Sequence, residues 1–231
     1  TPSNSSAASD VYKRQKLYSK LRKIADEEGI TIILIEHRLD QALKIADKLV
    51  ILRDGEVVFQ KNIEETSFND VLKYQFQERI KYRRIRSIRE RKSSSSKAIV
   101  ELQNVWYKYP RSRRYSLKNI SLSIAKGVKL GILGPNGSGK STLIKVIAGI
   151  LKPTKGYVTR YGNLKIGYVP QNPTLSFIKP TPYDEVFETA KNMGVEEPEL
   201  ETQKILKLLD LKKYSKKPVL HLSFGYRRRL S

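Results

Sequence analysis

Residues 134–142 read GPNGSGKST, which fits the G-x-x-x-x-G-K-[ST] spacing of a phosphate-binding loop in full. Glycines at these positions let the backbone curl until several N–H groups point into one concavity, and the following helix adds about half a positive charge there. Lys140 can reach β- and γ-phosphates as a point charge, and the Ser141 hydroxyl is placed to ligate Mg²⁺. The other residues of this phosphate loop are Gly134, Pro135, Asn136, Gly137, Ser138, Gly139 and Thr142. The segment therefore predicts a site for a nucleoside triphosphate with Mg²⁺.

The phosphate loop stands between a predicted strand and a predicted helix, which is the context that the motif requires. VKLGILG at 128–134 is a short apolar run that predicts a buried strand. TLIKVIAGIL at 142–151 predicts a helix that Pro153 closes. Its apolar face comprises Leu143, Ile144, Ile147 and Ile150. Residues 99–110 and 119–127 predict strands of an antiparallel sheet edge.

A second sheet-and-helix pattern precedes this one along the chain. Residues 16–28 predict a helix that Gly29 ends, and the β-branched run at 30–37 predicts a buried parallel strand. Residues 38–47 predict a second helix, and residues 48–60 predict two strands around an Asp54-Gly55 turn.

Residues 77–97 interrupt both patterns, since nine are basic, two are acidic and four serines stand together. Such a segment is too charged to bury and predicts a linker. The sequence therefore predicts an α/β protein with two domains, at 16–76 and 98–231, joined by a basic linker.

Composition limits the classes of partner. The chain has 231 residues, a formal net charge of +22 and no cysteine, so disulfide and thiolate chemistry are excluded. The charge favours nucleic acid, an anionic membrane surface or a nucleotide as partner, unless it reflects a general preference for Lys and Arg. No apolar run approaches the roughly 20 residues that span a bilayer.

The first fifteen residues do not read as part of a fold. Residues 5–15, SSAASDVYKRQ, resemble a translated sequencing adapter, and we expect residues 1–15 to be an artefact joined to the reading frame.

Around the phosphate loop the sequence resembles the nucleotide-binding domain of ABC-type ATPases, over residues 16–76 and 98–231. The resemblance implies a P-loop NTPase of the ABC ATPase fold, ATP and Mg²⁺ as cofactors, and a helical subdomain at about 172–231. Tyr109 falls where the family places an aromatic that stacks on adenine, with Trp106 and Tyr107 as alternatives. Gln171 matches the Q-loop glutamine, which in the family touches Mg²⁺ and links the site to the membrane partner.

Two further motifs carry the resemblance. LSFG at 222–225 matches the signature motif through Ser223 and Gly225, which would hold the γ-phosphate of ATP, whereas Phe224 and Tyr226 depart from the usual Gly and Gln. His37 matches the switch histidine that contacts the γ-phosphate. In the family two domains sandwich two ATPs, each between one domain's phosphate loop and the other's signature.

The Walker B aspartate, the glutamate beside it and the D-loop of the family are not found in this sequence. We therefore expect a tandem ATPase of which the sequence holds two incomplete nucleotide-binding domains, truncated at both ends. His37 and Ser223 would serve one ATP, and Tyr109, Lys140 and Gln171 the other. We expect this chain to bind nucleotide weakly without hydrolysing it, which turnover that vanishes on Lys140→Ala would refute.

A structural hypothesis follows from the family fold, in which the strand before the switch histidine neighbours the phosphate-loop strand. The strand at 30–36 could pair with residues 128–133 and complete a pseudo-permuted domain, with His37 near Lys140.

The resemblance is strongest to the fused ATPases of energy-coupling-factor or cobalt-type importers. It implies an ATPase that energises uptake of a small solute at the cytoplasmic face of the cell membrane, with a transmembrane subunit and a second nucleotide-binding domain as partners. The alternative is a soluble tandem ABC ATPase acting on the ribosome or nucleic acid, which the net charge favours. Arg38 speaks against it, because ribosome-directed members usually carry Asp after the histidine.

Overall fold

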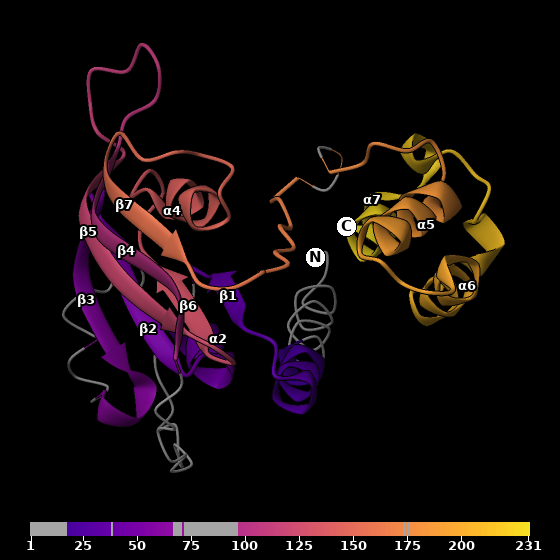
Figure 1. The fold of residues 1–231 in the computed structure, drawn as a ribbon, viewed down its shortest axis with the longest axis horizontal. Helices are drawn as coiled ribbons and strands as arrows, with labels where there is room; N and C mark the ends of the chain where they lie inside the picture. Colours follow the sequence, from indigo (N-terminus) through magenta and orange to yellow (C-terminus); the bar gives the residue numbers. More distant parts are fainter. Residues whose placement is uncertain (1–17, 38, 67–70, 72–96, 173, 175) are drawn as a thin grey trace, which may run out of the picture. The chain divides into compact units, whose positions relative to one another are not determined.

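The computed structural model describes residues 18–37, 39–66, 71, 97–172, 174 and 176–231. The chain divides into two compact units, Thr1–Leu164 and Lys165–Ser231 (Figure 1). The expected artefact at 1–15 and nearly all of the predicted linker lie outside the described residues.

The first sheet of unit 1 joins strands from both sides of the predicted linker. It comprises β1 (Ile32–Ile35), β2 (Lys48–Arg53), β3 (Glu56–Asn62) and β6 (Lys129–Leu133). The order is β1-β6-β2-β3, in which β6 runs parallel to both of its neighbours and β3 is antiparallel to β2 (Figure 1). The phosphate-loop strand β6 therefore lies between two strands of the first segment.

The hypothesis of a pairing between residues 30–36 and 128–133 is confirmed. The register aligns Ile32 with Lys129 and Ile35 with Ile132. The expectation that this strand is fully buried is wrong, because all four residues of β1 are partly exposed. The reason is its place at the end of the sheet order, where one side of the strand lacks a neighbour among the described strands.

The Asp54-Gly55 turn between β2 and β3 forms as predicted. Both residues have positive φ, 50° at Asp54 and 85° at Gly55, which is the backbone of a two-residue hairpin turn whose twist suits the flanking strands.

A second sheet contains β4 (Ala98–Tyr107), β5 (Leu117–Ala125) and β7 (Lys155–Arg160) in the order β5-β4-β7. The pairs are antiparallel, as predicted for β4 and β5. Sequence reasoning missed β7.

Unit 1 has three described helical segments besides the short turn η1 (Ile63–Glu65): residues 18–28, α2 (Leu39–Ile45) and α4 (Lys140–Ile147). The expectation that the last of these runs to residue 151 is wrong. Gly149 has a left-handed φ of 82°, and the Arg160 side chain donates to the carbonyls of Val146 and Ile147 at 2.6 and 2.9 Å. The helix therefore ends before Ile150, which is 53% exposed rather than part of the apolar face.

Alternation along β2 builds two hydrophobic cores, one on each face of the first sheet. Val50 and Leu52 pack with the second sheet and the buried face of α4, whereas Leu49 and Ile51 pack with α2. Gly131 on β6 lets α2 and the residue after it approach closely, since a Cβ there would lie 3.6 Å from that of Ala42 and 3.2 Å from that of Ala46.

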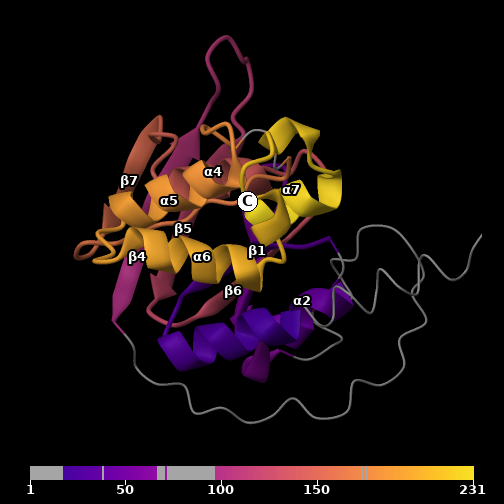
Figure 2. The ribbon, with the colours of Figure 1, turned by 90° about the vertical axis from the view of Figure 1, so that its right-hand side faces the viewer.

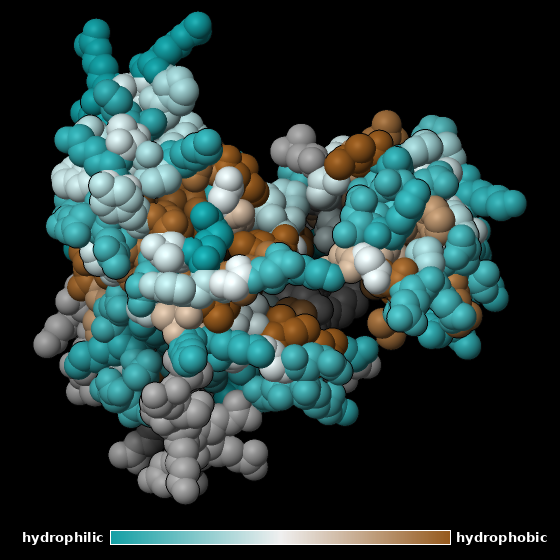
Figure 3. All heavy atoms as spheres, in the orientation of Figure 1, coloured by the Kyte–Doolittle hydropathy of each residue, from teal (hydrophilic) through white to brown (hydrophobic). Residues whose placement is uncertain are grey.

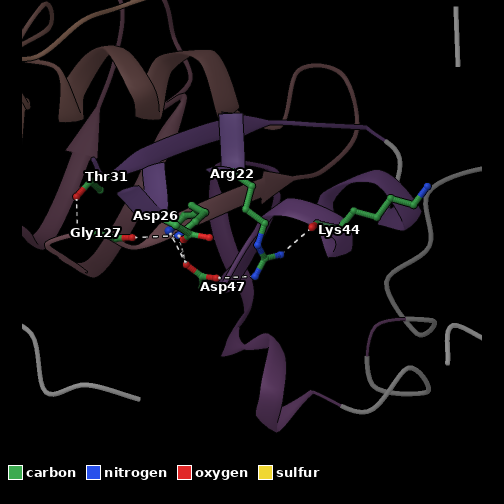
Figure 4. A network of polar contacts seen from close by, with 7 residues as sticks. Arg22, Asp26, Thr31, Lys44, Asp47 and Gly127 are labelled. Carbon is green, nitrogen blue, oxygen red and sulfur yellow. Dashed lines mark hydrogen bonds and ion pairs between the residues drawn. The ribbon is translucent and has the colours of Figure 1, made fainter. Parts of the chain in front are cut away.

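A buried ion-pair network ties the first segment of the chain to β6 (Figure 4). Lys129 is 4% exposed and its ammonium lies 2.9 Å from Asp26 Oδ1 and 3.1 Å from Asp47 Oδ2. The backbone N–H of Lys129 also donates to Asp47 Oδ2. Arg22 pairs with the other oxygen of Asp47 at 3.5 Å and donates to the carbonyl of Lys44 at 2.7 Å.

Unit 2 is helical and contains α5 (Pro182–Asn192), α6 (Pro198–Leu208), the short turns η3 (Lys212–Tyr214) and η4 (Val219–His221), and α7 (Phe224–Leu230) (Figure 2). The predicted helical subdomain falls within it. Its core is small and is formed by Val186, Leu206, Leu211 and Leu222.

Candidate nucleotide-binding site

The phosphate loop leaves β6 at a position where glycine is required. Gly134 has a φ of 146°, and a Cβ on it would lie 2.2 Å from the carbonyl oxygen of Leu52. Gly139 has a φ of 100°, and a Cβ on it would lie 2.5 Å from the carbonyl oxygen of Ser116. Both glycines therefore serve the loop's curl and its close approach to neighbouring backbone.

The loop is braced by the β2–β3 turn, a contact that sequence reasoning did not find. Gly55 N–H donates to the carbonyl of Ser138 at 3.2 Å, and the Gly55 carbonyl accepts from Lys118 N–H at 2.7 Å. The turn comes from the first segment of the chain, so that segment supports the phosphate loop as well as the sheet.

Lys140 begins α4 with its side chain folded over the loop. Its ammonium donates to the carbonyls of Gly134 at 2.9 Å and Pro135 at 2.7 Å, and the residue is 6% exposed. Burial lowers the pKa of Lys140, because desolvation disfavours the charged form. An anion placed beside this ammonium would offset that desolvation.

The residues of the loop fit the phosphates of a nucleotide. Glycines with positive φ at 134, 137 and 139 shape the loop, and the first turn of α4 presents free N–H groups. Ser138 Oγ is buried and lacks a hydrogen-bond partner among the described residues. Ser141 is exposed at the start of the same helix, where a hydroxyl can ligate a nucleotide-bound Mg²⁺.

The described part of the chain contains no group of three or more His, Cys, Asp or Glu that could hold a metal ion. Mg²⁺ in proteins is usually bound by one or two protein oxygens together with water and substrate phosphates, so a bound nucleotide would supply some of its ligands.

Of the three aromatic candidates for adenine stacking, Tyr109 is the one that the structure places beside the phosphate loop. Its hydroxyl lies 3.2 Å from Thr142 Oγ1 at the start of α4, and its side chain remains partly exposed. Tyr107 is buried in the core and holds the Tyr109 ring edge-to-face at 4.9 Å. Trp106 packs against Tyr115 at 5.1 Å instead.

We expect Tyr109→Ala to weaken ATP binding by roughly 5- to 150-fold, because base–aromatic stacking is worth about 1–3 kcal/mol. Tyr109→Phe keeps the ring and removes the bond to Thr142, so most of the affinity should remain. Isothermal titration calorimetry with ATP and Mg²⁺ compares the two. Equal losses in both variants would show that the hydroxyl, and not the ring, matters.

His37 follows β1 at the sheet edge where the phosphate loop begins. Glu36 N–H donates to the carbonyl of Ile132 at 3.1 Å, which continues the β1–β6 pairing by one residue. His37 is therefore level with the start of the loop, and its side chain is exposed. The Glu36 carboxylate accepts from His37 N–H at 2.9 Å and from the Tyr18 hydroxyl at 2.5 Å. Sequence reasoning gave no role to Glu36 or to Tyr18.

Gln171, Ser223 and Gly225 belong to unit 2, and their roles at a nucleotide stay predictions. Gln171 is exposed. The Ser223 hydroxyl caps α7 by accepting from Tyr226 N–H at 3.5 Å. The two departures from the signature differ in environment, since Phe224 is 53% exposed whereas the Tyr226 ring packs on Tyr214 at 4.8 Å.

Comparison with known families matches residues 117–231 to the ABC transporter family. This segment belongs to that family. It begins at the start of β5 and includes the phosphate loop, Gln171 and the predicted signature.

Individual relatives agree with the family. An ABC transporter ATP-binding protein of Clostridium tetani is 28% identical over 96% of this chain and 58% of its own length. The fold is that of a solved ATP-binding subunit of an ABC transporter, with a TM-score of 0.50 and 22% identity over 57% of this chain and 59% of that one. The solved cbiO1 of Clostridium perfringens, part of the ABC transporter complex cbiONQ, is 31% identical over 58% of this chain and 59% of its own, with a TM-score of 0.44.

The chain spans about half the length of the curated relatives that it matches. Within the described residues no helix is both long and apolar enough to cross a membrane.

Proposed function

We propose that this chain is part of the ATP-binding subunit of a membrane transporter, and that the whole protein energises uptake of a small solute. The observation that supports this most is the phosphate loop, with Lys140 buried over it and Tyr109 bonded to the first turn of the following helix. The resemblance to energy-coupling-factor and cobalt-type importers supports the direction of transport.

At this site the loop N–H groups would bind the phosphates, Lys140 would contact the β- and γ-phosphates, and Tyr109 would hold the adenine. Mg²⁺, held by Ser141, Gln171 and the phosphate oxygens, would neutralise charge that develops on the γ-phosphate. His37 would contact a γ-phosphate. In keeping with a tandem arrangement, we assign it and Ser223 to one ATP, and Tyr109, Lys140 and Gln171 to the other.

The proposal includes association with a transmembrane subunit, and a pull-down of the whole protein tests this association. We expect detergent extracts of the native host to yield an integral membrane protein with several apolar segments of about 20 residues. A soluble protein that instead co-purifies with ribosomes or RNA, in a manner that added salt reverses, would contradict the transport function. ATP binding would survive either outcome, because both classes of protein need it.

A further inference from the structure

Unit 2 has a group of positively charged side chains that have no role in the proposed nucleotide site. We define the lysine loop as residues 208–220, which run from the last residue of α6 through η3 into η4. Its four exposed lysines are Lys212, Lys213, Lys216 and Lys217. None of the four makes an ion pair with any described residue, although Lys213 also interacts with the Tyr214 hydroxyl and with the charge of Asp210.

The lysine loop has a fixed shape. Leu211 is fully buried and Val219 is 2% exposed, so both ends are anchored in the core of unit 2. Lys217 N–H donates to the Tyr214 carbonyl at 2.9 Å, and the Ser215 carbonyl accepts from Tyr183 N–H at 3.0 Å. The lysines are therefore held close together although like charges repel.

The Tyr214 ring contacts two of the four lysines. Lys213 and Lys217 lie over its ring, at 5.0 and 5.8 Å from the centroid. The hydrogen bond with Tyr226 and the charges of the two lysines lower the pKa of the Tyr214 hydroxyl.

Two large apolar side chains flank the lysines. Leu208 is 82% exposed and Leu220 is 69% exposed. Leu220 is next to the buried Val219, and Leu208 comes shortly before the buried Leu211. Hydrophilic and hydrophobic groups also stand side by side on the face of unit 2 seen in Figure 3. Leucines in this position can enter the boundary between headgroups and acyl chains while lysines contact the headgroups.

We propose that the lysine loop docks unit 2 onto a membrane surface rich in anionic phospholipid. Charge complementarity selects an anionic partner, and the flanking leucines select a lipid interface over a nucleic acid. Bases of a single-stranded nucleic acid stack on open aromatic rings, whereas the Tyr214 ring is already covered by Tyr226 and the two lysines.

Co-sedimentation with vesicles tests the proposal on the full chain without nucleotide. We expect binding to phosphatidylcholine vesicles that contain phosphatidylglycerol and not to phosphatidylcholine alone. Since each lysine near an anionic surface contributes about fivefold, replacing all four by Gln should weaken binding by roughly 600-fold. The double variant Leu208→Ser, Leu220→Ser should also weaken vesicle binding. That loss should depend less on the salt concentration than the loss caused by the lysine substitutions.

The matched control removes four exposed lysines of unit 1, namely Lys20, Lys44, Lys126 and Lys152. Both sets of substitutions lower the net charge from +22 to +18 (22 − 4). Equal losses of vesicle binding in the two variants would show that only the overall charge matters, and would overturn the proposal. Binding to single-stranded RNA but not to vesicles would overturn it as well. The proposal rests on the transport function only in that a transporter subunit works beside a membrane, and intact ATP binding in the lysine-loop variant separates the two.

Discussion

Lys140→Ala should weaken ATP binding by about 10- to 150-fold, since a hydrogen bond to a charged group is worth about 1.5–3 kcal/mol. In the structure its ammonium is already desolvated and bonded to two loop carbonyls, at 2.9 and 2.7 Å. An anionic phosphate would compensate the positive charge of this ammonium better than the two neutral carbonyls do. Calorimetric titration with ATP and Mg²⁺ measures the loss, and circular dichroism shows whether the fold is retained.

Lys145→Ala is the matched control, because it removes the same charge from the last turn of the same helix. We expect a small loss of stability, because the favourable interaction of Lys145 with the helix dipole is removed, and no change in ATP affinity. Lys140→Arg keeps the charge but not the compact ammonium, so its affinity should stay close to that of Lys140→Ala. Unchanged ATP affinity in Lys140→Ala would refute the assignment of the phosphate loop.

Local signals explain why so much of the phosphate loop could be predicted. Its glycines, the apolar strand before it and the helix after it are all indicated by residues that are close together in the sequence. The Asp54-Gly55 turn is equally local, since both residues must adopt positive φ. What the sequence could not show is that the two features touch, with Gly55 N–H bonded to the Ser138 carbonyl.

The errors have non-local causes. The end of α4 depends on Arg160, which comes from β7 and caps the carbonyls of Val146 and Ile147. The apolar pattern gave no sign of that contact and predicted a longer helix. The exposure of β1 depends on its place in the sheet order, which a pattern of β-branched residues does not determine.

The pairing of β1 with β6 was predicted by family resemblance and not by pattern. Its consequence is that residues on either side of the predicted linker share one sheet, although the tandem-domain organisation stays a prediction. Lys129 lies where these segments meet, at the first residue of β6. Its substitution is therefore a sharp test of the arrangement.

Lys129→Met should lower the free energy of unfolding of unit 1 by about 3 kcal/mol. That value is the low end for removing one partner of a buried ion pair, because Asp26 and Asp47 are each 31% exposed and keep some solvent. Without the ammonium, the two carboxylates would face an apolar side chain and each other. For a unit of this size the melting temperature should fall by roughly 6–12 °C.

Lys118→Met is the control, since Lys118 also pairs with a carboxylate, Glu56 at 3.6 Å, but at the surface. Exposed pairs contribute less than about 1 kcal/mol, so its melting temperature should change little. If Lys129→Met does not fold, Asp47→Asn offers a milder loss, because Asp26 still pairs with the ammonium. Equal melting temperatures for the Lys129 and Lys118 variants would mean that the ion pairs do not hold helix 18–28 and β2 against β6. In that event the shared sheet would have to depend on the apolar contacts of β2 and α2 alone.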